Sequence, residues 1–268
     1  MFYKINQCSV FDFYESDKDY ISFPFYFNGN PLDSVDSPRC CLTLHKAGSM
    51  RFRWNEKNEN RDSFFSGFNK QVVPLELIHS KIVYDVDSNP EKLLQKNGDG
   101  LITINQNIIP VVTVADCVPL YLFNPETKCF GVVHSGWKGT GIIYEAIDSA
   151  IKQYGGKISD FCVVIGPHIH NCCYSIDSDR VEFFTENFGK ECISFDTDDN
   201  AYLSLATANI QLLLKAGVLP QNILHCTDCT CCDTRLGSFR RETKNLPAEI
   251  DLQERLKLFT PMAAFVCF

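Results

Sequence analysis

The stretch that decides the fold runs from Thr113 to Gly139 and reads TVADCVPLYLFNPETKCFGVVHSGWKG. Asp116 and Cys117 stand at the end of one apolar run, and His134 stands at the end of the next. Two adjacent strands joined by the intervening proline-containing turn would bring these ends close together. A thiol and an imidazole that meet in this way form either a catalytic pair or part of a metal site, and the stretch alone leaves both open.

The residues that follow predict the clearest helix of the chain. From about Thr140, apolar side chains recur at helical spacing as far as Tyr154, and the glycine pair 155–156 supplies a stop. Further elements alternate along the rest of the chain: a strand over 161–165, helices near 178–188 and 206–216, and strands near Ile223 and Ala264. This alternation indicates an α/β or mixed α+β fold, with a mixed β-sheet core flanked by helices.

The residues before the stretch predict less regular structure. Tyr20–Phe27 alternates apolar side chains like a strand, and Pro24 places that strand at a sheet edge. A short amphipathic helix is expected after Asn60–Arg61. Residues 74–86 are rich in β-forming side chains, which predicts a strand-like segment with His79 in its middle.

The composition limits the function classes. The 268 residues are 45% hydrophobic and 22% charged, which is ordinary for a globular protein, and we expect a single domain over residues 1–268. With 25 basic and 33 acidic residues the net charge is -8, which disfavours nucleic acid as a partner. The sequence shows no apolar run long enough to cross a bilayer and no export signal, so we expect a cytoplasmic protein without a membrane partner.

The fourteen cysteines are expected to be reduced thiols because the sequence shows no export signal. Three adjacent pairs are poorly placed for internal disulfides: Cys40-Cys41, Cys172-Cys173 and Cys231-Cys232. The segment Cys226–Cys232 contains one C-x-x-C and follows His225. A strong zinc-ribbon signal needs a second, distant C-x-x-C, which the sequence lacks, so the segment is interpreted as a cysteine-rich loop.

His79, Cys117 and His134 form the first candidate site. Two histidines and a cysteine are ligands that zinc prefers, and a fourth position would stay open for water or substrate, as in a catalytic site. The alternative is that His79 is a hydrogen-bonded core histidine and Cys117 an inert buried thiol. Spacing alone favours this alternative for His79.

Four cations are candidates for binding an anion, because a guanidinium suits bidentate phosphate recognition: Arg61, Lys138, Arg240 and Arg241. Each, taken singly, is more often a solvated surface charge. Lys138 belongs to a Gly-Trp-Lys-Gly turn between a strand and a helix, where backbone amides could meet an anion.

Two carboxylates are candidates for acid–base work or for orienting a ligating histidine. Asp99 lies in a glycine-rich turn, which by itself accounts for an aspartate there. Asp116 precedes Cys117, and it could equally cap a turn or face solvent. His168 and His170 would share one side of an extended segment, and surface or capping roles are expected for both.

Four ordered motifs give the chain a specific resemblance. The segments TVADCVPLYLF, GVVHSGWKGTG, VVIGPHIHNCCYSID and GSFRRE resemble those of the multicopper polyphenol-oxidase, or laccase-domain, family, which includes purine nucleoside phosphorylases and the peptidoglycan editing factor. The match runs from about Asn60 to Arg241, whereas residues 1–50 and those after about 245 diverge. The resemblance implies the laccase-domain fold, which is similar to that of cytotoxic necrotizing factor toxins.

The resemblance also implies a metal site and an activity. The family's motifs place its zinc ligands at His79, Cys117 and His134, with copper as a second candidate metal. The implied activity is metal-dependent phosphorolysis of adenosine, inosine and methylthioadenosine, with adenosine deamination in addition. The implied partners are therefore a purine nucleoside and phosphate.

The remaining candidates take roles in the implied mechanism. Arg61 and Lys138 would orient phosphate against the anomeric carbon. Asp99 or Asp116 would handle the proton of the departing base. The chain departs from the family pattern at four places: Ile78 for Gln, Ser80 for Gly, Lys138 for Arg, and no TGR after the arginine pair.

Other enzyme classes use the same residues. Without metal, Cys117 as nucleophile and His134 as its base would form a cysteine hydrolase, and such a dyad does not require His79. A peptidoglycan-precursor editing hydrolase would act on a bulky, anionic substrate at the same site. A non-enzymatic binding module is a further alternative, against which the intact ligand set argues.

Overall fold

Two β-sheets packed face to face form the centre of the protein. The computed structural model describes residues 4–87, 90–247 and 249–268. The larger sheet has seven strands, in the order β1 (Asn6–Cys8), β16 (Ile223–Cys226), β12 (Cys162–Ile165), β10 (Val118–Phe123), β11 (Phe130–Ser135), β8 (Gly100–Thr103) and β7 (Val83–Asp85). The second has five, in the order β2 (Tyr20–Pro24), β5 (Arg39–Thr43), β17 (Met262–Cys267), β9 (Ile108–Val114) and β6 (Gln71–Pro74).

Smaller elements surround these sheets. A three-stranded sheet contains β13 (Ser175–Ile176), β15 (Ala201–Leu203) and β14 (Ile193–Phe195), and a hairpin contains β3 (Tyr26–Phe27) and β4 (Asn30–Pro31). The α-helices are α1 (Glu59–Ser66), α2 (Ile142–Tyr154), α3 (Ser178–Phe188), α4 (Leu205–Ala216), α5 (Phe239–Thr243) and α6 (Leu252–Arg255). Short 3₁₀ turns span Val10–Phe13, His45–Ala47, Pro90–Leu93, Ile158–Asp160, Lys190–Cys192 and Pro220–Asn222.

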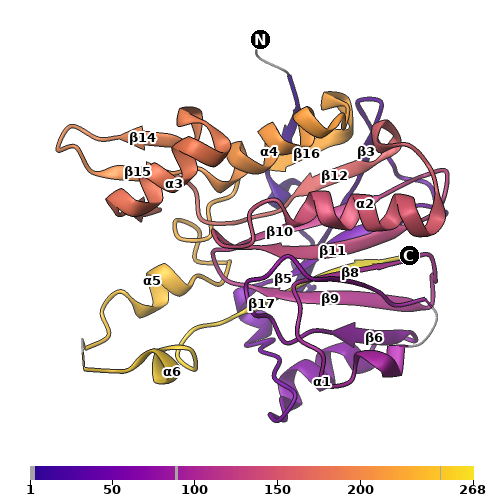
Figure 1. Cartoon of the computed structure of the whole chain (residues 1–268). Helices are drawn as coiled ribbons and strands as arrows, with labels where there is room; N and C mark the ends of the chain where they lie inside the picture. Colours follow the sequence, from indigo (N-terminus) through magenta and orange to yellow (C-terminus); the bar gives the residue numbers. More distant parts are fainter. Residues whose placement is uncertain (1–3, 88–89, 248) are drawn as a thin grey trace.

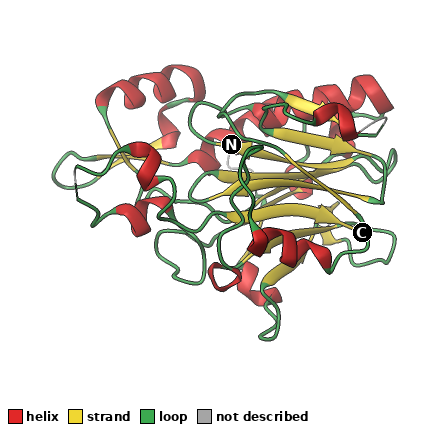
Figure 2. Ribbon diagram, turned by 90° about the horizontal axis from the view of Figure 1, so that it is seen from below, coloured by secondary structure: helices red, strands yellow, loops and turns green. Residues whose placement is uncertain are grey.

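The apolar core is arranged in layers. Phe23, Phe25 and Tyr121 belong to the layer between the two sheets, and all three are fully buried. Helices α2 and α4 cover the outer face of the seven-stranded sheet, and α1 covers the outer face of the five-stranded sheet. Figure 2 shows the strands grouped in the centre with helices around them. Since both large sheets combine parallel and antiparallel pairs, the expected mixed sheet flanked by helices is confirmed.

The helix expected after the central stretch is α2. Its buried face consists of apolar residues at helical spacing, namely Ile142, Ile143, Ala146, Ile147 and Ala150. The amide of Gly155 bonds the carbonyl of Ile151 at 2.8 Å and ends the helix, with φ at 79°. The helices α3 and α4 also lie where the sequence predicts them. Pro24 ends β2 at the edge of its sheet, as expected.

The predicted strand around His79 is wrong. Strands β6 and β7 flank this region, and residues between them form a loop. His79 has a φ of 59°, a left-handed conformation that β-strands do not use. The backbone amides of residues 78, 79 and 80 bond the carboxylate of Asp99 instead of a neighbouring strand. A side chain distant in sequence therefore replaces the strand partners that the local composition predicted.

One end of the sheets carries most of the remaining elements. Helices α3, α5 and α6 and strands β14 and β15 lie at the left of Figure 1, beyond the strand ends. The β9–β10 turn and the end of β11 face the same side. Among the described residues, no helix is long and apolar enough to span a membrane.

Candidate metal centre

The β10–β11 hairpin brings the central thiol and imidazole together. Pro119 on β10 pairs with His134 on β11, so Cys117, two residues earlier, adjoins the end of β11. The loop between β6 and β7 adds His79. The ligand atoms of His79, Cys117 and His134 all lie within 4.8 Å of one another. The rings of the two histidines meet edge to face, with centroids 4.8 Å apart.

Asp99 orients two of these three residues. Its carboxylate is fully buried, and Oδ1 accepts a hydrogen bond from Nδ1–H of His134 at 2.9 Å. The same Oδ1 accepts the backbone N–H of His79 at 3.0 Å. Oδ2 accepts the backbone N–H of Ser80 at 2.6 Å and its hydroxyl at 2.7 Å. Because Asp99 accepts Nδ1–H of His134, Nε2 is the nitrogen left for a metal, which would displace any proton on it, as in carboxylate–histidine–metal arrangements.

The electrostatics of the cluster favour a charged thiolate. Burial by itself raises the pKa of the Cys117 thiol, but the adjacent His134 charge and hydrogen bonds from both histidines outweigh it and lower the pKa to about 6. Burial lowers the pKa of His134, but the Cys117 thiolate and Asp99 together raise it to about 9. The Cys117 thiolate and the two imidazole nitrogens therefore form a set of three donors that fits zinc.

Gly136 leaves the space in which the ligands meet. A Cβ at this position would lie 3.0 Å from Cδ2 of His79 and 3.1 Å from Sγ of Cys117. We therefore expect Gly136→Ala to push the two ligands apart and to weaken zinc binding by at least about 10-fold, the lower range for disturbed ligand orientation. Competition with a chromophoric chelator measures this affinity.

Gly67→Ala is the matched control, since its Cβ would meet only the carbonyl of Phe64 at an ordinary 3.7 Å. It should bind zinc as the parent chain does. An unchanged zinc affinity in Gly136→Ala would show that the close approach of the ligands is not needed.

Asp116 holds the turn before Cys117 in place. It has a φ of 80° and is only 8% exposed. Its Oδ1 accepts the hydroxyl of Thr230 at 2.7 Å, and its Oδ2 accepts the backbone N–H of Arg240 at 2.6 Å. Burial raises the pKa of Asp116, although these hydrogen bonds oppose the rise. The carboxylate thus connects the turn before Cys117 to the loop after β16 and to the start of α5, and it lines the pocket described next.

A pocket of about 590 Å³ opens over the three ligands. This volume is typical of small-molecule sites. Its aromatic walls come from Phe52, Trp137, Tyr174, Phe239 and Phe259. Its cations are Arg51, Arg53, Arg180 and Arg240. The pocket therefore offers flat apolar surfaces and positive charge beside one candidate metal centre.

The cations predicted from the sequence lie in different places. Arg240 lines the pocket, whereas Lys138 is absent from its walls and stands over the ring of Trp137 at 5.3 Å. Arg241 donates to the carbonyls of Thr230 and Asp233, the second at 2.9 Å, and holds a loop. Of the four predicted cations, one reaches the candidate site.

Arg61 lies in a neighbouring pocket that shares Phe52 and Thr113 with the main one. Its guanidinium covers the ring of Phe52 at 4.8 Å and pairs with Asp62. Nη1 of Arg61 is buried without a hydrogen-bond partner among the described residues. Arg61 is therefore absent from the walls of the main pocket, and its predicted role in orienting phosphate stays a prediction.

Sequence reasoning missed Arg180 and Tyr174. Arg180 comes from α3, and its guanidinium stands 4.9 Å over the ring of Trp137. Tyr174 follows the cysteine pair and carries Arg240 over its ring at 5.6 Å. Tyr174 lies within the VVIGPHIHNCCYSID motif, which is the signal that could have marked it as a candidate. Arg180 lies in α3, outside the four motifs, and only the fold brings it to the pocket.

Two further clusters of metal-ligating side chains lie outside the pocket walls. His168 and His170 meet His225, with ligand nitrogens within 4.8 Å of one another, so the surface or capping roles expected for them do not describe their position. The second cluster joins Cys172 and Cys173 to Cys229 and Cys232. Cys226–Cys232 is therefore more than a cysteine-rich loop, because a second cysteine pair, distant in the sequence, lies beside it.

Comparisons with known proteins show the family of the chain. Residues 55–246 match the family model described as multi-copper polyphenol oxidoreductase laccase. The chain is 34% identical over 207 residues to a protein of Clostridium acetobutylicum named purine nucleoside phosphorylase, covering 76% of this chain and 85% of that one. It is 29% identical over 161 residues to a protein of an unknown prokaryotic organism named adenosine deaminase RL5, covering 58% of this chain and 62% of that one.

The fold has a counterpart among solved structures. YlmD from Geobacillus stearothermophilus superposes with a TM-score of 0.76 at 22% identity, covering 95% of this chain and 98% of that one. At this identity the likeness concerns the fold alone. The family match spans more than half of the sequence and includes His79, Cys117 and His134. The chain therefore belongs to the multi-copper polyphenol oxidoreductase laccase family.

Proposed function

We propose that the chain is a zinc-dependent purine nucleoside phosphorylase that acts on adenosine, inosine and methylthioadenosine and also deaminates adenosine. The observation that carries the proposal is the convergence of His79, Cys117 and His134 beneath a pocket with aromatic and cationic walls. The names of the relatives support the choice of substrate class. The fourteen cysteines are all free thiols, which supports the cytoplasm as the proposed location.

Zinc is the proposed metal because the donor set consists of one thiolate and two imidazoles. His79, Cys117 and His134 would hold it, with copper as the alternative that the same donors accept. When bound, zinc supplies Lewis-acid chemistry, which polarises an oxygen ligand and lowers the pKa of water. Metal analysis of the purified protein distinguishes zinc from copper.

Phosphorolysis requires a bound anion beside a flat base. A phosphate oxygen bonds to the anomeric carbon while the glycosidic C–N bond breaks, and the electron pair and a proton go to the departing purine. Arg180 and Arg240 would hold the phosphate charge, and Trp137 and Tyr174 would pack against the base. These residues would hold both substrates in one pocket. Holding two reactants close together and correctly oriented lowers the entropic part of the activation barrier.

Asp116 is the proposed proton donor to the departing base. It lines the pocket, and burial raises its pKa, so its protonated form persists at higher pH than that of an exposed aspartate. Asp99 is the less suitable candidate, because it does not line the pocket, and because its pKa, which burial by itself raises, is lowered overall by the adjacent His134 and Ser80. Its proposed role is to orient the ligands.

Deamination would use the same pocket without phosphate. A water oxygen bonds to the ring carbon that carries the amino group, the C–N bond breaks, and ammonia leaves with the proton that the water gives up. The product from adenosine is inosine.

The direct test is incubation of the purified chain with adenosine, with and without phosphate, followed by identification of the products. Free adenine and ribose 1-phosphate that form only with phosphate would support phosphorolysis. Inosine that forms without phosphate would support deamination. Formation of neither product by zinc-loaded protein would contradict the proposal.

Arg240→Gln tests the anion site. The change keeps a polar side chain but removes the charge, and we expect the KM for phosphate to rise about 10- to 100-fold, since a hydrogen bond to a charged group contributes about 1.5–3 kcal/mol. Steady-state kinetics with varied phosphate measures the change. Lys138→Gln is the control, because Lys138 lies over the ring of Trp137 and outside the pocket walls. Equal effects of both changes would contradict the assignment of Arg240.

A metal-free cysteine hydrolase is the second candidate. The observation that favours it is the Cys117–His134–Asp99 series, in which the pKa of the thiol is lowered to about 6 and Asp99 orients the imidazole. In zinc-free protein, alkylation of Cys117 should therefore be fast above about pH 6 and fall below it, because the thiolate is the reactive form.

The two candidates differ in the effect of metal on this reaction. Bound zinc should protect Cys117 from alkylation, and loss of zinc should abolish turnover. Full turnover by zinc-free protein, with inactivation upon alkylation, would favour the hydrolase. If the rate of Cys117 alkylation in zinc-free protein is half-maximal near the pKa of an ordinary thiol, His134 does not activate Cys117.

A further inference from the structure

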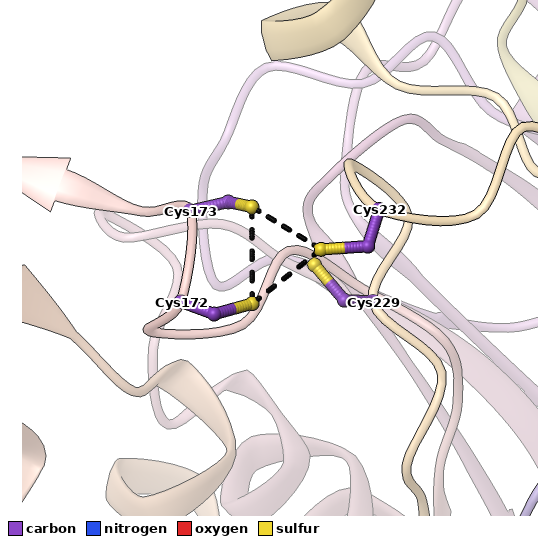
Figure 3. A group of neighbouring side chains, drawn as sticks. All are labelled: Cys172, Cys173, Cys229 and Cys232. Atoms are coloured by element: carbon purple, nitrogen blue, oxygen red, sulfur yellow. Dashed lines mark hydrogen bonds between the residues drawn. The ribbon is translucent and has the colours of Figure 1, made fainter.

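Four cysteine side chains from two distant segments converge at the protein surface (Figure 3). Cys172 and Cys173 lie in the loop after β12, and Cys229 and Cys232 lie in the loop after β16. Strands β12 and β16 are parallel neighbours, with Val163 opposite Ile223, so the loops that follow them leave the same edge of the sheet. The fold itself therefore brings the two cysteine pairs together.

Backbone pairing continues beyond these strands. His168 forms an isolated parallel bridge with Cys229, and the amide of Thr230 bonds the carbonyl of His168 at 3.0 Å. The amide of His170 donates to Sγ of Cys229 at 3.3 Å. A backbone N–H aimed at sulfur stabilises a thiolate, the form in which cysteine binds metal.

The distances among three of the sulfur atoms fit one face of a tetrahedron around one ion, and Sγ of Cys229 lies within 4.8 Å of each of the three. Sγ of Cys172 lies 3.8 Å from that of Cys173 and 3.7 Å from that of Cys232, and the latter two are 3.4 Å apart. With zinc–sulfur bonds of about 2.3 Å, the edges of a tetrahedral site are about 3.8 Å long. The sulfur–sulfur bond of a disulfide is about 2.05 Å long, so these thiols are not bonded in pairs, and their spacing suits ligands of one ion.

The sequence spacing also suits such a site. Cys229 and Cys232 form a C-x-x-C, and the adjacent pair Cys172-Cys173 supplies the other two sulfurs. Cys231 belongs to the same loop but is not one of the four whose ligand atoms lie within 4.8 Å of one another. Four thiolates in a tetrahedron are the donor set of structural zinc sites.

We propose that Cys172, Cys173, Cys229 and Cys232 bind a second, structural zinc ion that joins the loops after β12 and β16. These loops border the substrate pocket. Arg240 donates to the hydroxyl of Ser175 at 3.0 Å, next to the first pair, and Arg241 bonds the carbonyl of Asp233 at 2.9 Å, next to the second. The ion would thus fix Tyr174 and Arg240 in the pocket wall without touching a substrate.

The test uses the Cys117→Ala variant, in which the first metal site has lost its thiolate. The full chain is purified with zinc and without chelator, and its metal content is measured by mass spectrometry. We expect about one equivalent of zinc per chain in this variant and about two in the parent chain. Adding Cys172→Ser and Cys232→Ser should remove the remaining zinc and lower the Tm, whereas adding Cys231→Ser should change neither.

A spectroscopic measurement needs no change in the cluster and stays informative if the serine variants fail to fold. Cobalt loaded into Cys117→Ala should give intense sulfur-to-cobalt charge-transfer bands and the visible bands of a tetrahedral site. Absence of these bands, absence of zinc, or two disulfides in a thiol titration of the native protein would overturn the proposal. Iron or copper in place of zinc would overturn the identity of the metal.

Discussion

Cys117→Ala should remove one zinc ion and both proposed activities. Cys117 supplies the thiolate of the candidate centre, and the two remaining histidines would leave an incomplete ligand set. We expect kcat/KM for adenosine to fall more than about 100-fold, since even the loss of an outer hydrogen-bond partner of a ligand costs about 10- to 100-fold. Zinc content and product formation are measured on the same preparation.

Cys129→Ala is the matched control for this change. Cys129 is a fully buried thiol in the same β10–β11 hairpin, away from the three ligands, whereas Cys117 is half-buried. Its loss removes a similar volume and should leave zinc content and kcat/KM close to those of the parent chain. Retained phosphorolysis in zinc-free Cys117→Ala would contradict the proposed role of the metal.

Asp99→Asn should have the second-largest effect. The carboxylate orients His134 through Nδ1 and fixes the left-handed turn at His79. An amide keeps the shape, but its NH₂ group faces N–H donors, so at least one buried hydrogen bond is lost. We expect zinc affinity, measured by chelator competition, to fall about 10- to 100-fold, with a parallel loss of kcat/KM.

Asp87→Asn is the control for the loss of a carboxylate that accepts backbone hydrogen bonds. Asp87 also accepts several hydrogen bonds, including the backbone amides of Ile104 at 2.8 Å and Asn105 at 3.1 Å, but it lies outside the candidate site. This variant should lose some stability and keep its zinc affinity. If Asp99→Asn lowers Tm but binds zinc as the parent does, Asp99 supports the fold and does not orient the ligands.

The parts of the fold that sequence predicts well are those fixed by local patterns. The β10–β11 hairpin follows from two apolar runs and a turn, and its pairing places Cys117 beside His134. Helix α2 follows from helical spacing and a terminal glycine. In both cases the element is determined by residues that are close together in the sequence, so a local pattern is enough to predict it.

The rest of the site depends on contacts between distant segments. His79 adopts its turn because Asp99, twenty residues later, binds the amides around it. Arg180 and Tyr174 reach the pocket through the packing of α3 and the loop before it. The two cysteine pairs meet because β12 and β16 are parallel neighbours. No local composition or spacing encodes these approaches.

The measurement that tests the central proposal most directly is adenine formation from adenosine and phosphate by one preparation in three states. The protein is assayed as purified, after removal of zinc by chelation, and after zinc is restored. The account predicts that adenine formation is lost with zinc and returns with it, in step with zinc content. Equal adenine formation by the zinc-free protein would contradict it.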